Sequence, residues 1–194
     1  MKNYWDKYYN KNSSPLKPSA FAVYCKKYLG AYKNKVFDVG CGNGRDTIYF
    51  NNNKINCIGI DKSKQAISLN QRRKRSLKKK FINFDFSKFK YNKVIETFSV
   101  YSRFSLHSIN KKKELDFFQR INSSKKIDYI LIEVRSIFDE LNGKGKKIGK
   151  NEFVTSHYRR FIDPLVIKKQ IKKSFVIKLF KVGKNFARYK NENP

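Results

Sequence analysis

One short segment limits what this chain can fold into more than any other. An apolar run at residues 36–40 leads directly into three glycines at alternate positions, Gly40, Gly42 and Gly44, and a helix-forming stretch follows from Arg45. A buried strand, a tight glycine turn and a helix in this order are typical of the first unit of an open α/β sheet. Glycines in such a turn allow a ligand to approach the backbone closely.

The same alternation of strand and helix continues along the chain. Strands are expected at residues 55–60, 81–84, 93–101 and 128–134, and helices at 19–29, 45–50, 63–72, 110–121 and 163–173. This order predicts right-handed βαβ units and a parallel sheet. A closing hairpin is expected from residues 175–182 and 186–189.

The domain organisation follows from the length of 194 residues, for which one domain is the expectation. Residues 1–194 are therefore predicted to form a single domain. Residues 1–30 form its N-terminal cap, in which residues 1–18 are predicted as a loop or lid. Residues 137–162 form an insertion on the substrate side.

Acidic residues are scarce, yet three of them stand at or beside predicted strand ends. Asp38 precedes the glycine loop, Asp61 follows Gly40 by 21 residues, and Asp85 closes the third strand. A carboxylate placed like Asp61 suits the hydroxyl groups of a ribose. The spacing G-x-G-x-G and the acidic lining are unfavourable for a pyrophosphate and suit a cationic adenosyl compound. S-adenosylmethionine is such a ligand.

The segment Asp38-Val-Gly-Cys-Gly-Asn-Gly44, with Asp61 and Asp85, resembles the class I S-adenosylmethionine-dependent methyltransferase pattern. The resemblance implies a Rossmann-like, seven-stranded, mostly parallel sheet with helices on both faces and a C-terminal antiparallel hairpin. It implies that the loop holds the methionine and ribose part, Asp61 the ribose hydroxyls and Asp85 the adenine amino group. The candidate cofactor-binding residues are Asp38, Gly40, Cys41, Gly42, Asn43, Gly44, Asp61, Asp85, Phe86 and Tyr101.

More specific matches lie downstream. The segments Tyr101–His107, Glu133–Arg135, Asp139-Glu140 and His157–Arg160 are similar to a bacterial subgroup related to tellurite-resistance-type methyltransferases. Members of that subgroup often accompany surface-polysaccharide genes.

The two histidines of the chain, His107 and His157, are the candidate catalytic residues, because a hydroxyl nucleophile benefits from a base. The alternative is that His107 is a packed histidine at the start of a helix. The candidate substrate-binding residues are Arg103, Arg135, Tyr158, Arg159 and Arg160. Arginines suit a carboxylate or phosphate. The alternative for the 157–160 cluster is a structural ion-pair network with Asp139 or Glu140.

The chain carries 45 Lys and Arg against 15 Asp and Glu, a net charge of +30. Such a surplus raises the possibility of nucleic-acid binding, although codon use rich in A and T explains part of the lysine content. The densest run, residues 72–80, has seven basic residues in nine. It lies between a helix and the next strand, so we expect it to face away from the ligand end of the sheet.

These observations favour a methyltransferase that acts on a small-molecule or glycan acceptor, with anionic acceptors preferred. An RNA methyltransferase recruited by the basic surface is less favoured, because the fourth strand runs into Ser99-Val-Tyr-Ser102 without a base-embracing Pro-Pro motif. A non-catalytic S-adenosylmethionine-binding module is the third possibility. No secretory signal, membrane span or metal-ligand spacing of the three cysteines is recognised, so we expect a cytoplasmic protein without a metal.

Overall fold

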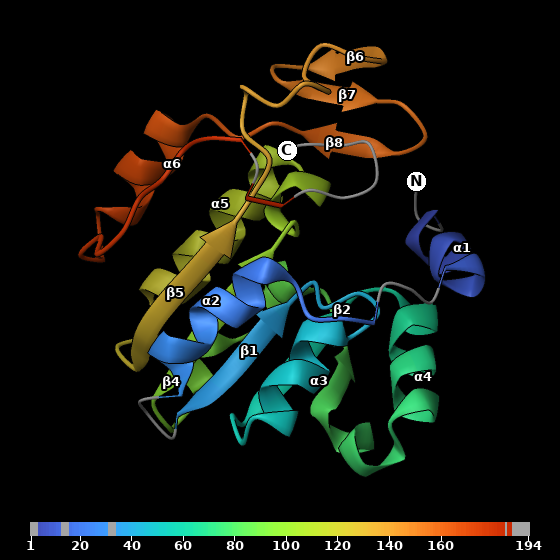
Figure 1. Ribbon diagram of the computed structural model, residues 1–194. Coiled ribbons are helices and arrows are strands. Elements are labelled where there is room, and N and C mark those ends of the chain that lie inside the picture. The colour runs from blue at the N-terminus through green and yellow to red at the C-terminus, as the bar shows by residue number, and fades with distance from the viewer. Residues whose placement is uncertain (1–3, 13–15, 31–33, 185, 188–194) are drawn as a thin grey trace.

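A five-stranded parallel sheet is the centre of the structure, a computed structural model that describes residues 4–12, 16–30, 34–184 and 186–187. The sheet has the strand order β3-β2-β1-β4-β5 (Figure 1). Its members are β1 (Lys35–Val39), β2 (Cys57–Asp61), β3 (Phe81–Asn83), β4 (Phe98–Arg103) and β5 (Ile127–Glu133). The predicted parallel α/β sheet is confirmed for these five strands.

The strand order reverses next to β1. The chain first adds β2 and β3 on one side of β1 and then places β4 and β5 on the other. Asp38 near the end of β1 is in register with Gly59 of β2 and with Tyr101 of β4. In open α/β sheets ligands bind beyond the carboxyl ends of the strands at such a reversal, because neighbouring loops diverge there. The glycine loop after β1 occupies this position.

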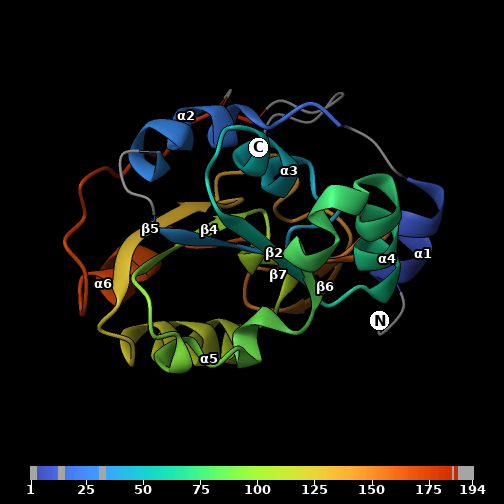
Figure 2. The same cartoon turned by 90° about the horizontal axis from the view of Figure 1, so that it is seen from below.

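Helices cover both faces of the sheet, with α2 and α3 on one face and α5 on the other (Figure 2). Their bounds are α2 (Ala20–Leu29), α3 (Arg45–Asn52), α4 (Lys64–Arg73), α5 (Lys111–Asn122) and α6 (Pro164–Ile171). Ser19, Ser63 and Asp163, the first residues of three predicted helices, act as N-caps and accept hydrogen bonds from the first-turn amides of α2, α4 and α6. Among the described residues no helix has the length and apolar character needed to cross a bilayer.

Two apolar cores hold the layers together. Phe37, Phe98 and Phe117 are buried between the sheet and α5. Cys25 of α2 and Phe50 of α3 are buried against the opposite face of the sheet. Because strands buried on both faces must be apolar throughout, the continuous apolar runs of the sequence identify this sheet correctly.

The N-terminal cap differs from the prediction. Tyr4–Lys11 form a helix, α1, so the loop predicted for residues 1–18 is wrong there, while residues 1–3 and 13–15 lie outside the described part of the chain. The physical reason is the spacing of Tyr4, Trp5, Tyr8 and Tyr9, which gathers four aromatic rings on one side of a helix.

The insertion at residues 137–162 contains a separate antiparallel sheet in the order β6-β7-β8. Its strands are β6 (Lys146–Gly149), β7 (Glu152–Val154) and β8 (Tyr158–Arg160). This sheet lies beyond the carboxyl end of β5 (Figure 1). None of its three strands was predicted from the sequence.

The predicted closing hairpin is absent from the part of it that the structure describes, since residues 175–184 form no strand. Asn185 and residues 188–194 lie outside the described residues. Phe175 and Phe180 pack against the core beside α5, whereas Val176 and Val182 are exposed. The segment is therefore attached by two aromatic side chains without backbone pairing to β5, and the expected seven-stranded sheet has five described strands.

A buried ion pair joins the insertion sheet to the main domain. Arg160 of β8 donates from Nη2 to a carboxylate oxygen of Glu114 on α5 and from Nε to the carbonyl oxygen of Ile109, at 3.1 Å. Glu114 also accepts from Lys111, whose own side chain is 43% exposed. Glu114 and Arg160 are both buried, so neither charge can turn to water if its partner is lost.

We predict that Glu114→Ala lowers the free energy of unfolding by about 3–5 kcal/mol, because it leaves the Arg160 guanidinium buried without its carboxylate. Lys111→Ala removes the exposed member of the same network and should cost less than about 1 kcal/mol. Urea unfolding of both variants measures the difference. Equal losses would contradict a structural role for the buried pair.

Candidate active site

The glycine loop between β1 and α3 is held by the neighbouring strand. The Gly40 amide donates to the carbonyl oxygen of Ile60 at 2.7 Å. Gly40, Gly42 and Gly44 have φ values of 74°, 53° and 72°, a region in which side chains are strained. A Cβ at Gly42 would also lie 2.2 Å from the hydroxyl oxygen of Tyr9. Both the backbone conformation and the close approach of a neighbour therefore require glycine in this loop.

Asp61, the last residue of β2, lies directly against the glycine loop. Its Oδ2 accepts a hydrogen bond from the Gly42 amide at 2.9 Å, and its Oδ1 accepts one from the Ser63 amide at 2.8 Å. Burial raises the pKa of this carboxyl above its usual value, although the two hydrogen bonds act in the opposite direction. The sequence placed Asp61 at the loop, and the structure brings the two together.

Asp38 lies beneath the same loop. It is buried, and its Oδ2 accepts a hydrogen bond from the Thr47 hydroxyl at 2.6 Å. Burial, followed by the negative charge of Asp46, raises the pKa of Asp38 to about 8. A carboxyl held in this state is stabilised in its ionised form by any cation that binds nearby.

Tyr101 does not occupy the position that the sequence analysis gave it. Its side chain is completely buried, its hydroxyl donates to Asp46 Oδ2 at 2.8 Å, and its ring stacks on Phe21 at 5.3 Å. Ser19 also donates to Asp46, through its amide and its hydroxyl, each at 2.8 Å. Because its polar atom is already engaged and its ring lies in the core, Tyr101 positions the first turn of α3 and does not face a ligand.

Asp85, after β3, is the third acidic strand end. Its Oδ2 accepts from Lys113 Nζ at 2.6 Å, and its Oδ1 accepts from the Ser87 amide at 3.1 Å. Burial opposes ionisation, but the hydrogen bonds from Lys113 and Ser87 hold the pKa of Asp85 below its usual value.

Phe86 is buried against Phe117 with ring centroids 5.3 Å apart, so its ring belongs to the core and not to a wall of the cofactor site.

Helix α1 packs beside α4 and reaches the glycine loop (Figure 1). Asp6 Oδ1 accepts hydrogen bonds from the Ser63 hydroxyl at 2.7 Å and from the Gln65 amide at 3.2 Å, and so caps α4. The phenol of Tyr9 lies against Gly42. Burial, with the charge of Asp61 as the next cause, raises the pKa of Tyr9 well above its usual value.

His157 connects α1 to the insertion sheet. Its ring stacks on Tyr4 with centroids 4.7 Å apart and meets Trp5 at 5.2 Å. Burial, and then the charges of Arg159 and Arg135, lower the pKa of His157 to about 4, so the ring is neutral at physiological pH. The cap helix is thus attached to α4 through Asp6 and to the insertion through His157.

His107 follows β4 in the short 3₁₀ helix η4 (Leu106–Ser108). It is buried, and its Nδ1 has no hydrogen-bond partner among the described residues. Burial, and next the charge of Arg135, lower its pKa well below the usual value, so the imidazole is neutral. Ser105, two residues earlier, donates to the Val39 carbonyl at 2.5 Å and holds this segment against the glycine loop.

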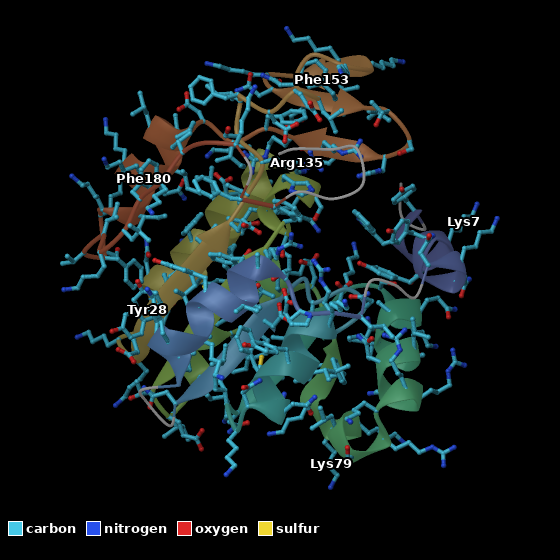
Figure 3. The ribbon with its side chains drawn as sticks, viewed as in Figure 1. Lys7, Tyr28, Lys79, Arg135, Phe153 and Phe180 are labelled. Atoms are coloured by element: carbon cyan, nitrogen blue, oxygen red, sulfur yellow. The ribbon has the colours of Figure 1, made fainter. Side chains whose placement is uncertain are left out.

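Cationic side chains gather beside His107 at the carboxyl ends of β4 and β5. Arg103 pairs with Glu133 at 2.7 Å, and its guanidinium lies 4.4 Å from the ring centroid of Phe104. The Arg135 guanidinium lies 5.5 Å from the same ring (Figure 3 shows Arg135 beneath the insertion sheet). Phe104 has φ 53°, which is unusual for a bulky residue and occurs most often at functional sites.

The remaining predicted substrate residues lie on the insertion strand β8. Arg160 is structural, as the ion-pair alternative proposed, but its partner is Glu114 and not Asp139 or Glu140. Asp139 pairs instead with Arg135 at 2.9 Å. Arg159 and Tyr158 are half-buried, and the Arg159 guanidinium donates to the Thr155 hydroxyl at 2.5 Å.

Two further residues of the glycine loop, Cys41 and Asn43, are buried. The Cys41 side chain is buried with Ile67 and Phe81, and burial raises its thiol pKa well above the usual value, which agrees with a packing role. Asn43 is buried, and its carbonyl oxygen accepts from Arg73 at 3.2 Å. Arg73 therefore reaches back to the loop, in contrast to the outward direction predicted for the whole basic run.

Three important contacts were not found from the sequence: Tyr9 against the loop, Asp46 as acceptor for Ser19 and Tyr101, and Ser105 against Gly40. A signal existed for Asp46, since an acid in the first turn of a helix complements the helix dipole. No local pattern marks Tyr9 or Ser105, because their partners lie far away in the sequence.

Comparison with known proteins identifies the family. Residues 32–133, which include the loop, the three acidic strand ends and β4, match the methyltransferase domain family. The chain belongs to this family. It is therefore a methyl-transferring enzyme, and its acidic loop region fits S-adenosylmethionine as the methyl donor. None of the curated proteins compared with the sequence matches it.

Solved structures share the fold of this methyltransferase. The glycopeptide N-methyltransferase MtfA with S-adenosyl-L-homocysteine is 12% identical, with 91% of this chain and 87% of that chain covered at a TM-score of 0.61. A methyltransferase from Clostridium acetobutylicum is 13% identical over 90% and 80% of the chains, with a TM-score of 0.60. The PH0226 protein of Pyrococcus horikoshii is 17% identical over 90% and 85%, with a TM-score of 0.59. At these identities the likeness concerns the fold.

We predict that Gly42→Ala impairs the methyltransferase far more than Gly143→Ala. Both glycines have positive φ, 53° and 89°, so each alanine carries a backbone cost of about 1–2 kcal/mol. Only the alanine at position 42 also meets Tyr9, because nothing lies within 4 Å at Gly143. Urea unfolding and calorimetric titration with S-adenosylhomocysteine measure the effect. Adding Tyr9→Phe should restore part of the loss, and no rescue would contradict the close approach.

The raised pKa of Asp38 predicts that cofactor binding releases a proton. Below pH 8 the carboxyl is largely protonated, and a cationic ligand favours its ionised form. Affinity for S-adenosylmethionine should therefore rise as the pH rises towards about 8, by at most about tenfold per unit, and level off above it. Titration calorimetry in buffers of different ionisation enthalpy measures the released proton. If Asp38→Asn leaves the pH dependence unchanged, Asp38 only orients the loop.

Proposed function

We propose that this methyltransferase acts on an anionic small-molecule or glycan acceptor. The observation that carries the proposal is the neutral imidazole of His107 among cationic side chains, next to the glycine loop. A carboxylate or phosphate on the acceptor would be attracted by Arg135 and Arg159, whose charges both lower the pKa of His107. MtfA, whose fold this chain shares, is a glycopeptide N-methyltransferase, which adds support for a glycan-bearing acceptor.

The cofactor residues of this proposal are those at the loop. Gly40–Gly44 would lie along the methionine and ribose part, Asp61 would bind the ribose hydroxyls, and Asp85 would bind the adenine amino group in place of Lys113. Bound S-adenosylmethionine supplies an electrophilic methyl group on a sulfonium. The buried carboxyl of Asp38 supports this assignment because a cationic ligand would favour its ionised form.

His107 would be the general base that removes a proton from the acceptor. Its unpartnered Nδ1 can accept a proton from an acceptor hydroxyl, but the surrounding arginines make it a weak base in the absence of an anion. An anionic acceptor would offset these positive charges and raise the pKa of His107. Binding of an anionic acceptor would thus make His107 a stronger base, whereas binding of a neutral acceptor would raise its pKa less. His157, stacked between two aromatic residues of α1, fits a role in holding the cap and not in catalysis.

We further propose the finer assignments that follow from the sequence. Residues 1–194 would form a single domain, in line with the chain length. The chain would belong to the subgroup related to tellurite-resistance-type methyltransferases, which is supported by the segments Tyr101–His107 and His157–Arg160. A cytoplasmic location is supported by the three cysteines of the chain, Cys25, Cys41 and Cys57, because all of them are free thiols. RNA methylation remains the alternative acceptor class.

The test is S-adenosylhomocysteine release with acceptors in matched pairs, uronic-acid glycans against their methyl esters and hydroxy acids against their amides, with RNA as a third class. We expect anionic members to be preferred. Arg159→Gln should raise KM for the anionic members with little effect on the neutral ones, and Asp61→Ala should abolish transfer to every acceptor. Preference for neutral acceptors, or transfer to RNA alone, would overturn the proposal.

A further inference from the structure

The outer side of β3 carries an apolar groove that plays no part in the site described above. The groove has a volume of about 350 Å³ and is lined by Ile82, Phe84, Lys88, Phe89, Lys90, Lys93 and Val94. Phe84 is 45% exposed and Ile82 is 36% exposed. The phenyl rings of Phe84 and Phe89 meet nearly at right angles, with centroids 6.2 Å apart.

The groove exists because the crossover from β3 to β4 is unusually thin. A crossover between parallel strands is normally an α-helix that covers the sheet. Here it contains only two short 3₁₀ helices, η2 (Phe86–Lys88) and η3 (Tyr91–Lys93). Since β3 is the edge strand, Ile82 within it and Phe84 directly after it stay exposed beside this crossover.

The rim of the groove is strongly basic. Lys88, Lys90 and Lys93 are exposed, and the lining includes no acidic residue. The chain enters β3 directly from the 3₁₀ helix η1 (Arg75–Lys80), whose Lys79 points away from the body of the molecule (Figure 3). This end of the molecule is opposite the insertion sheet (Figure 1). A multiply charged partner fits a rim of this kind better than a ligand with a single carboxylate.

We infer that this groove binds single-stranded nucleic acid. Unpaired bases stack on exposed aromatic rings while lysines follow the phosphate backbone, a combination that is tolerant of sequence. Phe84 and Phe89 provide the rings, and Lys88, Lys90 and Lys93 provide the charges. The bases of a duplex are already stacked and could not enter.

The nucleic acid bound here is a partner and not the methyl acceptor. The groove lies at the edge formed by β3, whereas His107 follows β4, which is three strands away in the sheet. At about 4.8 Å per strand this separates the two sites by roughly 14 Å. The inference is therefore independent of the acceptor class proposed above.

The test is fluorescence anisotropy of labelled 15-nucleotide oligo(U) RNA and oligo(dT) at several salt concentrations. We expect Phe84→Ala to weaken binding about tenfold without changing the salt dependence. The triple variant Lys88→Gln, Lys90→Gln, Lys93→Gln should weaken the salt dependence. The magnitude of the negative slope of log K against log salt should fall by about 2, since each single-strand phosphate contact contributes about 0.7.

The chain offers matched controls. Phe138 is 66% exposed, and Lys144, Lys146 and Lys147 are exposed on the insertion, so Phe138→Ala and the corresponding triple Gln variant make the same chemical changes elsewhere. Equal effects of test and control variants would show diffuse electrostatic binding and overturn the proposal. Binding to phosphatidylserine vesicles without binding to either oligonucleotide would overturn it as well. Calorimetric titration with S-adenosylhomocysteine should stay unchanged in all variants, which confirms that they are folded.

Discussion

The hydrogen bond from the Gly42 amide to Asp61 is the contact on which the ligand end of this protein depends. It joins the end of β2 to the loop that follows β1, at the point where the strand order reverses. The positive φ values of Gly40, Gly42 and Gly44 turn the chain from strand to helix within five residues. At Gly42 a Cβ would lie 2.2 Å from the Tyr9 hydroxyl oxygen. The absence of side chains at the glycines therefore permits both the backbone conformation of the loop and the close approach of other groups to it.

Helix α1 makes the cap part of the site. Asp6 binds the first turn of α4, Tyr9 lies on the glycine loop, and Tyr4 and Trp5 contact His157 of the insertion. A single short helix thus touches both the glycine loop and the insertion. Isolated helices of this length are marginal in water, so α1 depends on these tertiary contacts for its stability.

The charged residues of the protein are distributed over three separate regions. Three carboxyl groups, Asp38, Asp46 and Asp61, are concentrated at the loop, and their burial next to one another raises the pKa of Asp38 to about 8. Arginines surround His107 at the ends of β4 and β5. Exposed lysines lie along the rim of the β3 groove. The net charge of +30 therefore does not describe one surface, and only its local distribution bears on function.

The sequence by itself determined the parallel sheet, the helix caps and the loop with Asp61, because these depend on local periodicity, turn chemistry and short spacings. It could not identify Tyr101 and Phe86 as core residues, because which face of a segment is buried depends on the helices packed against it. It did not predict helix α1, because the aromatic face of this helix is stabilised by contacts with α4 and His157 that are distant in sequence. It also gave Arg160 the wrong partner. Only the tertiary structure decided these points, since Arg160 meets Glu114 across 46 residues and Tyr101 meets Asp46 across 55. Contacts at such separations are set by the packing of whole elements and leave no mark in the local sequence.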